Sequence, residues 1–238
     1  MTRLVAVLTI GLLALTGCSD DNKPTPDQTT QAADPVSLLT AAKKTLDETA
    51  SVHVVLDSRD IPDTAQALSK GDGVVTHAPA FTGKLSFDNK GSMIDGDVVA
   101  VGGKVYVKLS FTQSFIEFSP KQLADLGAPD PSTFIDPAKG IGSWLPALKN
   151  PVLKGESRRG TVIVTEISGT VTGATLAGLF PKAQATQQFP ATFGIDKDNN
   201  RLVSVMISGP FYAGATTTYD ITFDRYGEQV TITKPSPS

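Results

Sequence analysis

After one short helical segment, the hydrophobic pattern of this chain repeats every second residue almost to its end. Val52, Val54 and Leu56 alternate with their neighbours, and Leu85 and Phe87 do the same further along. A period of two is typical of strands that bury one face of a sheet and expose the other. The pattern therefore predicts a fold dominated by antiparallel strands.

More strands follow from the same alternation and from the turn residues between them. Gly102-Gly103 separates two alternating runs and predicts a hairpin. Residues 197–200 and 226–228 hold the Gly, Asn and Asp residues that turns favour. The further predicted strands are residues 94–101, 104–109, 115–118, 161–168, 191–196, 202–208, 216–225 and 229–233.

Helices are predicted at the start of the domain and in its middle. Asp34-Pro35 is a good helix start, with Asp as N-cap and Pro in the first turn, and apolar residues at helical spacing extend the helix to about residue 50. Residues 121–126 predict a helical turn and residues 172–179 a short helix. The stretch 128–137 holds three prolines and predicts a loop, after which apolar residues from 141 to 148 share one helical face.

Together these elements predict an α+β domain with helices on one face of a curved antiparallel sheet. The helical insert between the two strand blocks carries apolar residues, and the concave face of the sheet is where they can be buried. A cavity remains there if the helices do not fill the space. The low aromatic content of 7% is in keeping with such a cavity.

The N-terminus predicts a membrane anchor. Arg3 precedes an apolar run of about 12 residues, shorter than the ~20 that a membrane span needs. The run ends in Leu15-Thr16-Gly17-Cys18, the lipobox pattern in which small residues let a peptidase cut before a cysteine that carries acyl chains. The alternative is an ordinary signal peptide that happens to contain a cysteine. Cys18 is the only cysteine, so the fold has no disulfide within one chain.

The domain boundaries follow from these features. We expect a lipoprotein signal peptide at 1–17, the lipidated cysteine with a disordered tether at 18–34, and one folded domain at 35–238. The tether is rich in Asp, Thr, Gln and Pro and has almost no apolar residue to bury. Acidic residues outnumber basic ones, 24 to 21, and no basic patch stands out, which argues against a nucleic-acid partner.

No residue pattern predicts catalysis, a metal or a cofactor. A zinc site would need carboxylate partners, since the chain has only His53, His77 and the cysteine of the anchor, and both histidines are interpreted as surface or core-edge residues. Ser143 follows a glycine but lacks the surrounding nucleophile-elbow motif. We therefore expect a binding protein and not an enzyme.

One stretch resembles half of a calcium loop. Asp196, Asp198 and Asn200 have the right spacing, but the sixth position is Arg201 where glycine is needed and the twelfth is Ile207 where glutamate is needed. A hairpin turn is the favoured interpretation.

From Pro35 to its end, the chain resembles the mycobacterial lipoproteins LppX, LprA, LprF and LprG, and is most similar to the LprG type. No catalytic signature carries the resemblance; the order and spacing of several short stretches does. These are residues 51–56, 94–99, 103–107, 135–138, 190–192, 226–228 and 233–235. The chain departs from the family pattern in the spacer between Leu56 and Val74.

The resemblance implies a half-barrel sheet with helices over its concave face and a hydrophobic cavity for acyl chains. It also implies a carrier at the outer face of the plasma membrane that moves envelope lipids, such as triacylated glycolipids or triacylglycerol, toward the outer envelope with a major-facilitator exporter. Two alternatives are kept: an anchored adaptor of an exporter with no cargo of its own, and a cell-wall hydrolase or esterase, against which the missing nucleophile motifs count.

Candidate cavity residues follow from alternation and from the resemblance, which places Leu85 on a strand of the cavity wall. The wall is predicted to comprise Leu85, Phe87, Val99, Val101, Val105 and Val107, and the helical roof Phe134, Ile141, Trp144, Leu145, Leu148, Leu176 and Leu179. The alternative is that these residues are solid core, because apolar periodicity is the same in both cases.

Overall fold

The computed structural model of the protein describes residues 34–125 and 128–236. Residues 33–238 form one compact unit. The expected signal peptide, Cys18 and all of the expected tether except Asp34 lie outside the described residues, so those predictions remain predictions.

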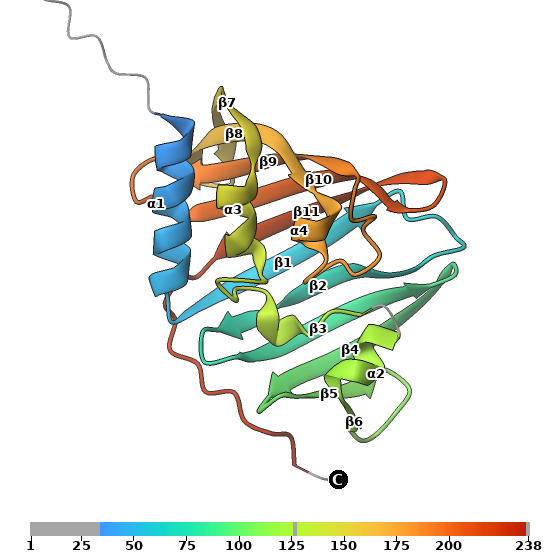
Figure 1. The fold of residues 1–238 in the computed structure, drawn as a ribbon. Coiled ribbons are helices and arrows are strands. Elements are labelled where there is room, and N and C mark those ends of the chain that lie inside the picture. Colours follow the sequence, from blue (N-terminus) through green and yellow to red (C-terminus); the bar gives the residue numbers. More distant parts are fainter. Residues whose placement is uncertain (1–33, 126–127, 237–238) are drawn as a thin grey trace, which may run out of the picture. The chain divides into compact units, whose positions relative to one another are not determined.

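An open sheet of eleven strands forms the framework of the domain (Figure 1). The strand order is β6-β5-β4-β3-β2-β1-β11-β10-β9-β8-β7, and all neighbours are antiparallel. The two edge strands, β6 and β7, do not pair with each other, so the sheet is not closed into a barrel. The strands are β1 (Ser51–Arg59), β2 (Gln66–Thr76), β3 (Ala80–Asn89), β4 (Ser92–Val101), β5 (Lys104–Leu109), β6 (Ile116–Phe118), β7 (Lys149–Arg159), β8 (Val162–Thr172), β9 (Gln188–Asp196), β10 (Leu202–Tyr212) and β11 (Ala215–Asp224).

Two consecutive meanders, β1–β6 and β7–β11, meet where β1 pairs with β11. The chain between β6 and β7 must therefore pass from one edge of the sheet to the other, and it does so across one face (Figure 1). This crossover holds α2 (Pro120–Asp125), η1 (Pro131–Thr133), η2 (Ile141–Ser143) and α3 (Trp144–Ala147). With α1 (Pro35–Glu48) and α4 (Gly173–Leu176), it confirms the predicted α+β class with helices packed on one face of an antiparallel sheet.

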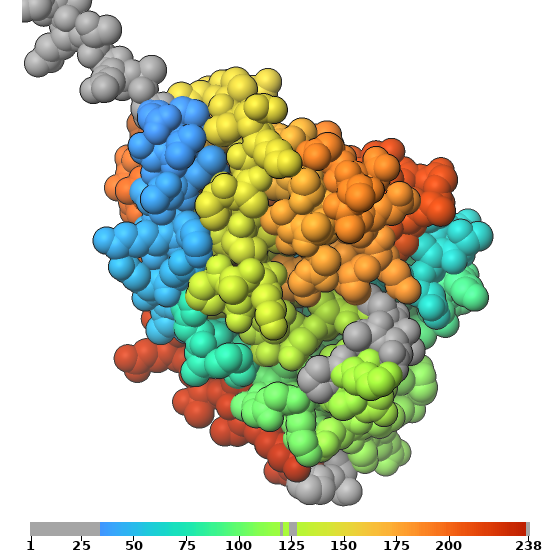
Figure 2. Space-filling model, in the orientation of Figure 1, coloured from blue at the N-terminus to red at the C-terminus, as the bar shows by residue number. Residues whose placement is uncertain are grey.

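We call this face, crossed by the helices, the covered face, and the opposite one the outer face. In Figure 2, α1 and the chain around α3 and α4 lie over its upper part. Apolar side chains of α1 are buried there at Leu39, Ala42 and Leu46. The helix begins as predicted, with the Asp34 carboxylate accepting a hydrogen bond of 2.9 Å from the Ser37 amide. The hydrogen bonds from Ser37 lower the pKa of Asp34.

Two strands were not predicted, and the reasons are physical. β2 has glycine at Gly71 and Gly73, covered-face positions where alternation would require apolar side chains. β7 is an edge strand that is exposed along most of its length and is broken by two register shifts, so it lacks alternation. Such irregular, charged edges protect a sheet from pairing with other chains.

One predicted strand is absent: residues 229–233 have no strand conformation. The last strand, β11, ends at Asp224 and lies between β10 and β1, so both of its sides are already paired. The chain after Asp224 adds no further strand to the sheet. None of the helices in the part of the chain described above is both long and apolar enough to cross a membrane.

Candidate functional site

An apolar cavity of about 270 Å³ lies on the covered face of β3, β4 and β5. Its walls are aliphatic and aromatic, and its polar residues are confined to the ends of β2 and β3. The lining residues are Gln66, Leu85, Phe87, Asp88, Asn89, Ile94, Gly96, Val98, Val105, Val107, Leu109, Phe118, Leu123, Ala128, Pro129 and Pro131.

Strand register explains the sheet wall of the cavity. Residues directly opposite each other on neighbouring strands share a face. Leu85 lies opposite Gly96 on β4, and Gly96 lies opposite Leu109 on β5. A Cβ atom at Gly96 would come within 3.1 Å of Val107 Cγ1. Glycine at this position therefore keeps the cavity open between larger neighbours.

The cover and the rim come from other parts of the chain. Leu123 of α2 and the residues Ala128, Pro129 and Pro131 of the crossover lie over the cavity. At the rim, the Gln66 side-chain amide donates a hydrogen bond of 2.8 Å to Asn89 Oδ1. The lining therefore has an apolar interior and one polar end, an arrangement suited to a ligand with an apolar chain and a polar head.

Four of the predicted wall residues, Leu85, Phe87, Val105 and Val107, line this cavity. Val99 and Val101 do not, and placing them on the same face was wrong. Because Gly102-Gly103 is a two-residue turn, Val105 lies opposite Ala100 and Val107 opposite Val98. Val99 and Val101 therefore lie on the outer face, since a shift of one residue moves a side chain to the other side of a sheet.

The seven predicted roof residues are buried elsewhere, and the expectation that they roof the cavity is corrected. Trp144 is fully buried, with its ring 6.0 Å from that of Phe180, and Phe134 packs edge-on against Phe81. None of the seven lines the cavity; all belong to the hydrophobic core. They are Phe134, Ile141, Trp144, Leu145, Leu148, Leu176 and Leu179.

Most of the residues that prediction missed fall into two groups; the others are Phe118 of β6 and the polar rim residues Gln66, Asp88 and Asn89. Ile94, Gly96, Val98 and Leu109 could have been found from the glycine turn, which fixes the register of β4 and β5. The cover residues from Leu123 to Pro131 had no such signal. They lie in a short helix and a proline-containing segment where no periodicity points to a face.

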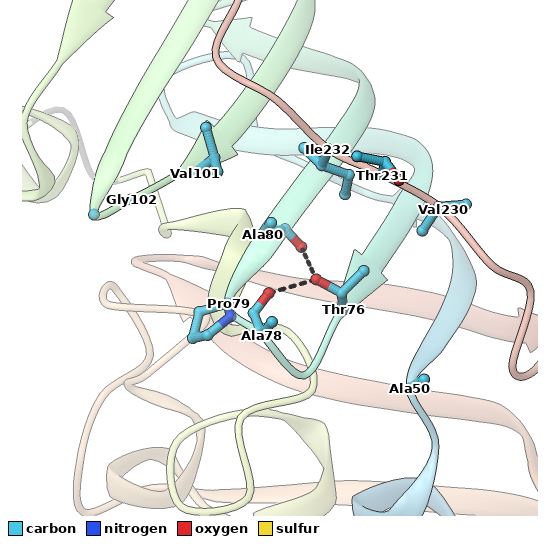
Figure 3. A pocket seen from close by; sticks show the side chains of 11 residues that line it. Ala50, Thr76, Ala78, Pro79, Ala80, Val101, Gly102, Val230, Thr231 and Ile232 are labelled. Carbon is cyan, nitrogen blue, oxygen red and sulfur yellow. Dashed lines mark hydrogen bonds between the residues drawn. The ribbon is translucent and has the colours of Figure 1, made fainter.

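A second opening, of about 600 Å³, lies between the β2–β3 turn, the β4–β5 turn and the C-terminal segment (Figure 3). Small side chains and backbone groups line it, among them Ala78, Pro79 and Gly102. The Thr76 hydroxyl donates a hydrogen bond of 2.5 Å to the Ala78 carbonyl there. Val101 lies in this groove. With few large apolar side chains, the groove is a poorer site for an acyl chain than the covered-face cavity.

The polar clusters of the domain lie away from the cavity. His53 is buried between two carboxylates, with Nδ1 2.6 Å from Asp224 Oδ1 and Nε2 2.9 Å from Asp72 Oδ1. Asp196 Oδ1 accepts a hydrogen bond from the Asp198 amide, which confirms a hairpin turn between β9 and β10. Within residues 34–125 and 128–236, no group of side chains could hold a metal ion.

On the other half of the covered face, buried aromatic and aliphatic side chains pack together, among them Phe180, Phe211 and Tyr219. The hydroxyls of Tyr212 and Tyr219 lie 2.9 Å apart, and burial raises the pKa of both. The void beside them, next to Leu179 and Phe180, is only about 10 Å³. Among the described residues, the apolar cavity large enough for part of an acyl chain lies on the β3–β5 half of the covered face, and the void beside Tyr219 is far smaller.

Sequence comparison identifies relatives across nearly the whole chain. The model of the LppX_LprAFG lipoprotein family matches residues 34–232. A lipoarabinomannan carrier protein LprG from Mycobacterium tuberculosis is 28% identical over 236 residues, which covers 99% of this chain and 95% of that protein. The protein of the same name from Mycobacterium leprae is 23% identical over 248 residues, with the same coverage.

Solved structures show the same fold. LprF from Mycobacterium bovis superposes with a TM-score of 0.71 at 19% identity, covering 85% of this chain and 97% of that one. The lipoprotein LppX from Mycobacterium tuberculosis gives a TM-score of 0.62 at 19% identity, covering 84% and 98%.

Proposed function

The chain belongs to the LppX_LprAFG lipoprotein family, and from this premise we propose that it is a membrane-anchored carrier that binds the acyl chains of cell-envelope lipids. The observation that carries the proposal is the cavity on the covered face, with its aliphatic and aromatic interior and one polar end. The name of the relatives, lipoarabinomannan carrier protein, supports a lipid as cargo.

A carrier needs such a cavity because exposing an acyl chain to water costs a large amount of free energy. Each methylene transferred from water to an apolar site contributes about 0.8 kcal/mol, so a chain of about 16 carbons amounts to roughly 12 kcal/mol. A lipid leaves a membrane at a useful rate only if a dry site receives it. Leu85, Val98 and Val107 offer one, and they lie on neighbouring strands that hold the wall rigid.

The size of the cavity favours one acyl chain at a time in this conformation. Its volume of about 270 Å³ lies just below the range of roughly 300–1,000 Å³ that is usual for small-molecule sites. We propose that a triacylated glycolipid or triacylglycerol binds when the cover at Leu123, Ala128 and Pro131 moves away from the sheet. The polar head then stays at the rim beside Gln66 and Asn89.

The remaining parts of the proposal concern the location and the partners. Cys18 anchors the domain to the outer face of the plasma membrane, and a major-facilitator exporter passes the lipid on toward the outer envelope. The protein acts by binding and not by catalysis. In support, the described residues of the cavity interior include neither a nucleophile nor a charged group, and the carboxylate that borders it, Asp88, accepts a hydrogen bond from the Gly91 amide.

The test is a pair of substitutions on one strand. Val98→Trp places an indole inside the cavity, whereas Val99→Trp places it on the outer face of β4. Residues 19–238, purified natively from a bacterial host, are examined for bound acyl lipid by mass spectrometry. We expect the wild type and Val99→Trp to carry bound lipid, and Val98→Trp to lose most of it.

Thermal melting checks that both variants fold. Absence of acyl lipid from the folded wild-type protein, together with normal envelope function of Val98→Trp in cells, would overturn the carrier proposal. That pair of results would favour the anchored adaptor, for which a filled cavity has no consequence.

A further inference from the structure

The free edge of the sheet at β7 carries an excess of positive charge. Residues 137–195 hold six basic and only two acidic side chains, in a chain whose net charge is −3. Four of the six basic residues lie on β7 and are exposed: Lys149, Lys154, Arg158 and Arg159. Because β7 is the last strand of the sheet, side chains from both of its faces can reach past its unpaired side. We call this side of the sheet, with its four basic residues, the basic edge.

Most of this charge is not neutralised by neighbouring carboxylates. Arg159 pairs with Glu166 of β8 at 3.0 Å, and the other three basic residues of the strand form no ion pair among the described residues. The strand itself holds one acidic residue, Glu156. The basic edge therefore keeps a positive excess on a protein that is acidic as a whole.

Charged residues on an edge strand also keep other strands from pairing with it. That role needs charge of either sign, so it does not explain why four of the five charged residues of β7 are basic. The two register shifts of β7, at residues 149–152 and 153–155, already interrupt its ladder. An irregular edge is a poor template for an added strand, so an anionic surface fits the basic edge better than a protein strand does.

The basic edge lies where the chain enters the domain. Asp34 caps α1, and this helix packs against β7. Figures 1 and 2 show β7 beside the first turns of α1, at the top of the view. The 16 residues from Ser19 to Asp34, which follow the proposed anchor at Cys18, can span at most about 55 Å. An anchored domain therefore has its basic edge within reach of the lipid head groups.

We propose that the basic edge docks the domain onto anionic phospholipid head groups. Basic residues near an anionic membrane surface add to the attachment that acyl chains provide. The inference rests on the proposed anchor, and it concerns the orientation of the domain and not its cargo.

Docking by this edge determines which way the cavity faces. The cavity lies over β3–β5, and β4 is eight strand positions from β7, or roughly 38 Å along the sheet. The docked domain holds the cavity away from the bilayer, on the side of the outer envelope. Release from the head groups lets the tether bring the cavity back to the bilayer.

The experiment measures binding of residues 19–238, which retain the whole compact unit, to vesicles by sedimentation at low salt. The vesicles consist of phosphatidylglycerol or of phosphatidylcholine. Because the protein is acidic overall, an even spread of charge predicts repulsion from phosphatidylglycerol. We expect binding to phosphatidylglycerol, little binding to phosphatidylcholine, and loss of the difference at high salt, where charges are screened.

A pair of double variants locates the attraction. Lys154→Gln/Arg158→Gln should weaken binding to phosphatidylglycerol roughly thirtyfold, because each basic residue near the surface is worth about a factor of five. Lys70→Gln/Lys90→Gln is the matched control. It removes the same charge from exposed positions on β2 and in the β3–β4 turn, and it should bind like the wild type. Thermal melting checks that both variants fold.

A fluorescent probe reports which part of the domain touches the vesicle. Residues 19–238 contain no cysteine, so Thr161→Cys provides a single attachment site in the turn between β7 and β8. The emission of an environment-sensitive dye at this site should shift to the blue when phosphatidylglycerol vesicles are added. The same dye at Ser92→Cys, at the start of β4, should show no shift.

Equal binding to the two lipids, or unchanged binding of Lys154→Gln/Arg158→Gln, overturns the proposal. An equal loss in Lys70→Gln/Lys90→Gln overturns it as well, because binding would then follow net charge and not the basic edge. Co-purified acyl lipid is measured separately and stays the same in both double variants. Failure of the docking proposal and failure of the carrier proposal therefore give different results.

Discussion

Gly73 makes room for the ring of Phe81 on the covered face of the sheet. A Cβ atom at Gly73 would lie 2.5 Å from Phe81 Cζ and 2.6 Å from the Thr82 carbonyl oxygen. The ring of Phe81 in turn packs edge-on against Phe134 of the crossover, at 6.1 Å between centroids. A single absent side chain thus allows the crossover to approach the centre of the sheet.

This contact gives a residue-scale prediction. Gly73→Ala forces Phe81 away from the sheet and should lower the free energy of unfolding by roughly 1–3 kcal/mol, the usual cost of overpacking. Gly71→Ala, two residues away on the same face, meets only the Leu85 Cδ2 atom at 3.1 Å and the Leu56 Cβ atom at 3.7 Å. It should cost less than about 1 kcal/mol, since Leu85 can turn toward the cavity.

Urea denaturation of the two variants measures the difference. Equal stability of Gly73→Ala and Gly71→Ala would show that Phe81 is free to move and does not position the crossover.

Among the elements, the C-terminal segment differs most from expectation. Alternation at 229–233 predicted a strand, but the segment has no strand pairing; its first residues hold it by hydrogen bonds, and further on Lys234 Nζ lies 5.5 Å from the centre of the Tyr106 ring. The Tyr226 hydroxyl donates a hydrogen bond of 2.6 Å to the Leu202 carbonyl, and the Arg201 guanidinium lies 5.2 Å from the centre of the ring. Burial raises the pKa of this hydroxyl above its usual range, so it remains a donor in alkaline solution as well. The Gly227 amide then binds the Ser51 carbonyl at 2.8 Å.

Truncation at two points tests where the segment is fixed. A chain that ends at Glu228 keeps the Tyr226 and Gly227 contacts and should melt within about 4 °C of the full chain. A chain that ends at Arg225 loses a hydrogen bond and the packing of a tyrosine ring, so its melting temperature should fall by roughly 6–12 °C. Differential scanning calorimetry compares them; a large loss already at Glu228 would mean that residues 229–236 are structural after all.

At the scale of the whole molecule, the β6–β7 crossover divides the covered face into two halves. Buried core residues pack around α1, α3 and α4, whereas over β3–β5 the described residues that cover the cavity are Leu123 and those from Ala128 to Pro131. The cavity follows from this unequal cover together with the space that Gly96 leaves between its larger neighbours.

The anchor is a prediction for the whole chain. Cys18→Ser removes the site of acylation, and the compact unit of residues 33–238 should fold as before. The variant should move from the membrane to the released fraction, because stable attachment requires two or more acyl chains. Ser19→Ala is the control that keeps the cysteine; retention of Cys18→Ser in washed membranes would contradict the lipobox assignment.

The sequence by itself determined the antiparallel sheet, the N-terminal helix and the face of most strands. These features depend on local periodicity and on turns. The two-residue turn at Gly102-Gly103 also fixes the register of β4 and β5, from which the pairing of Val98 with Val107 could have been predicted. The two strands that it did not indicate, β2 and β7, carry glycines or exposed polar residues in place of alternation.

Only the tertiary structure decided which apolar residues are core and which line a cavity. Periodicity predicts that a side chain is buried, but it does not predict whether other side chains pack against it or whether a cavity lies beside it. Trp144 and Leu85 show the same burial signal, yet the ring of Trp144 packs against Phe180 whereas Leu85 lines the cavity. That difference depends on the path of the crossover between the two edges of the sheet, which is set by contacts between residues far apart in the chain.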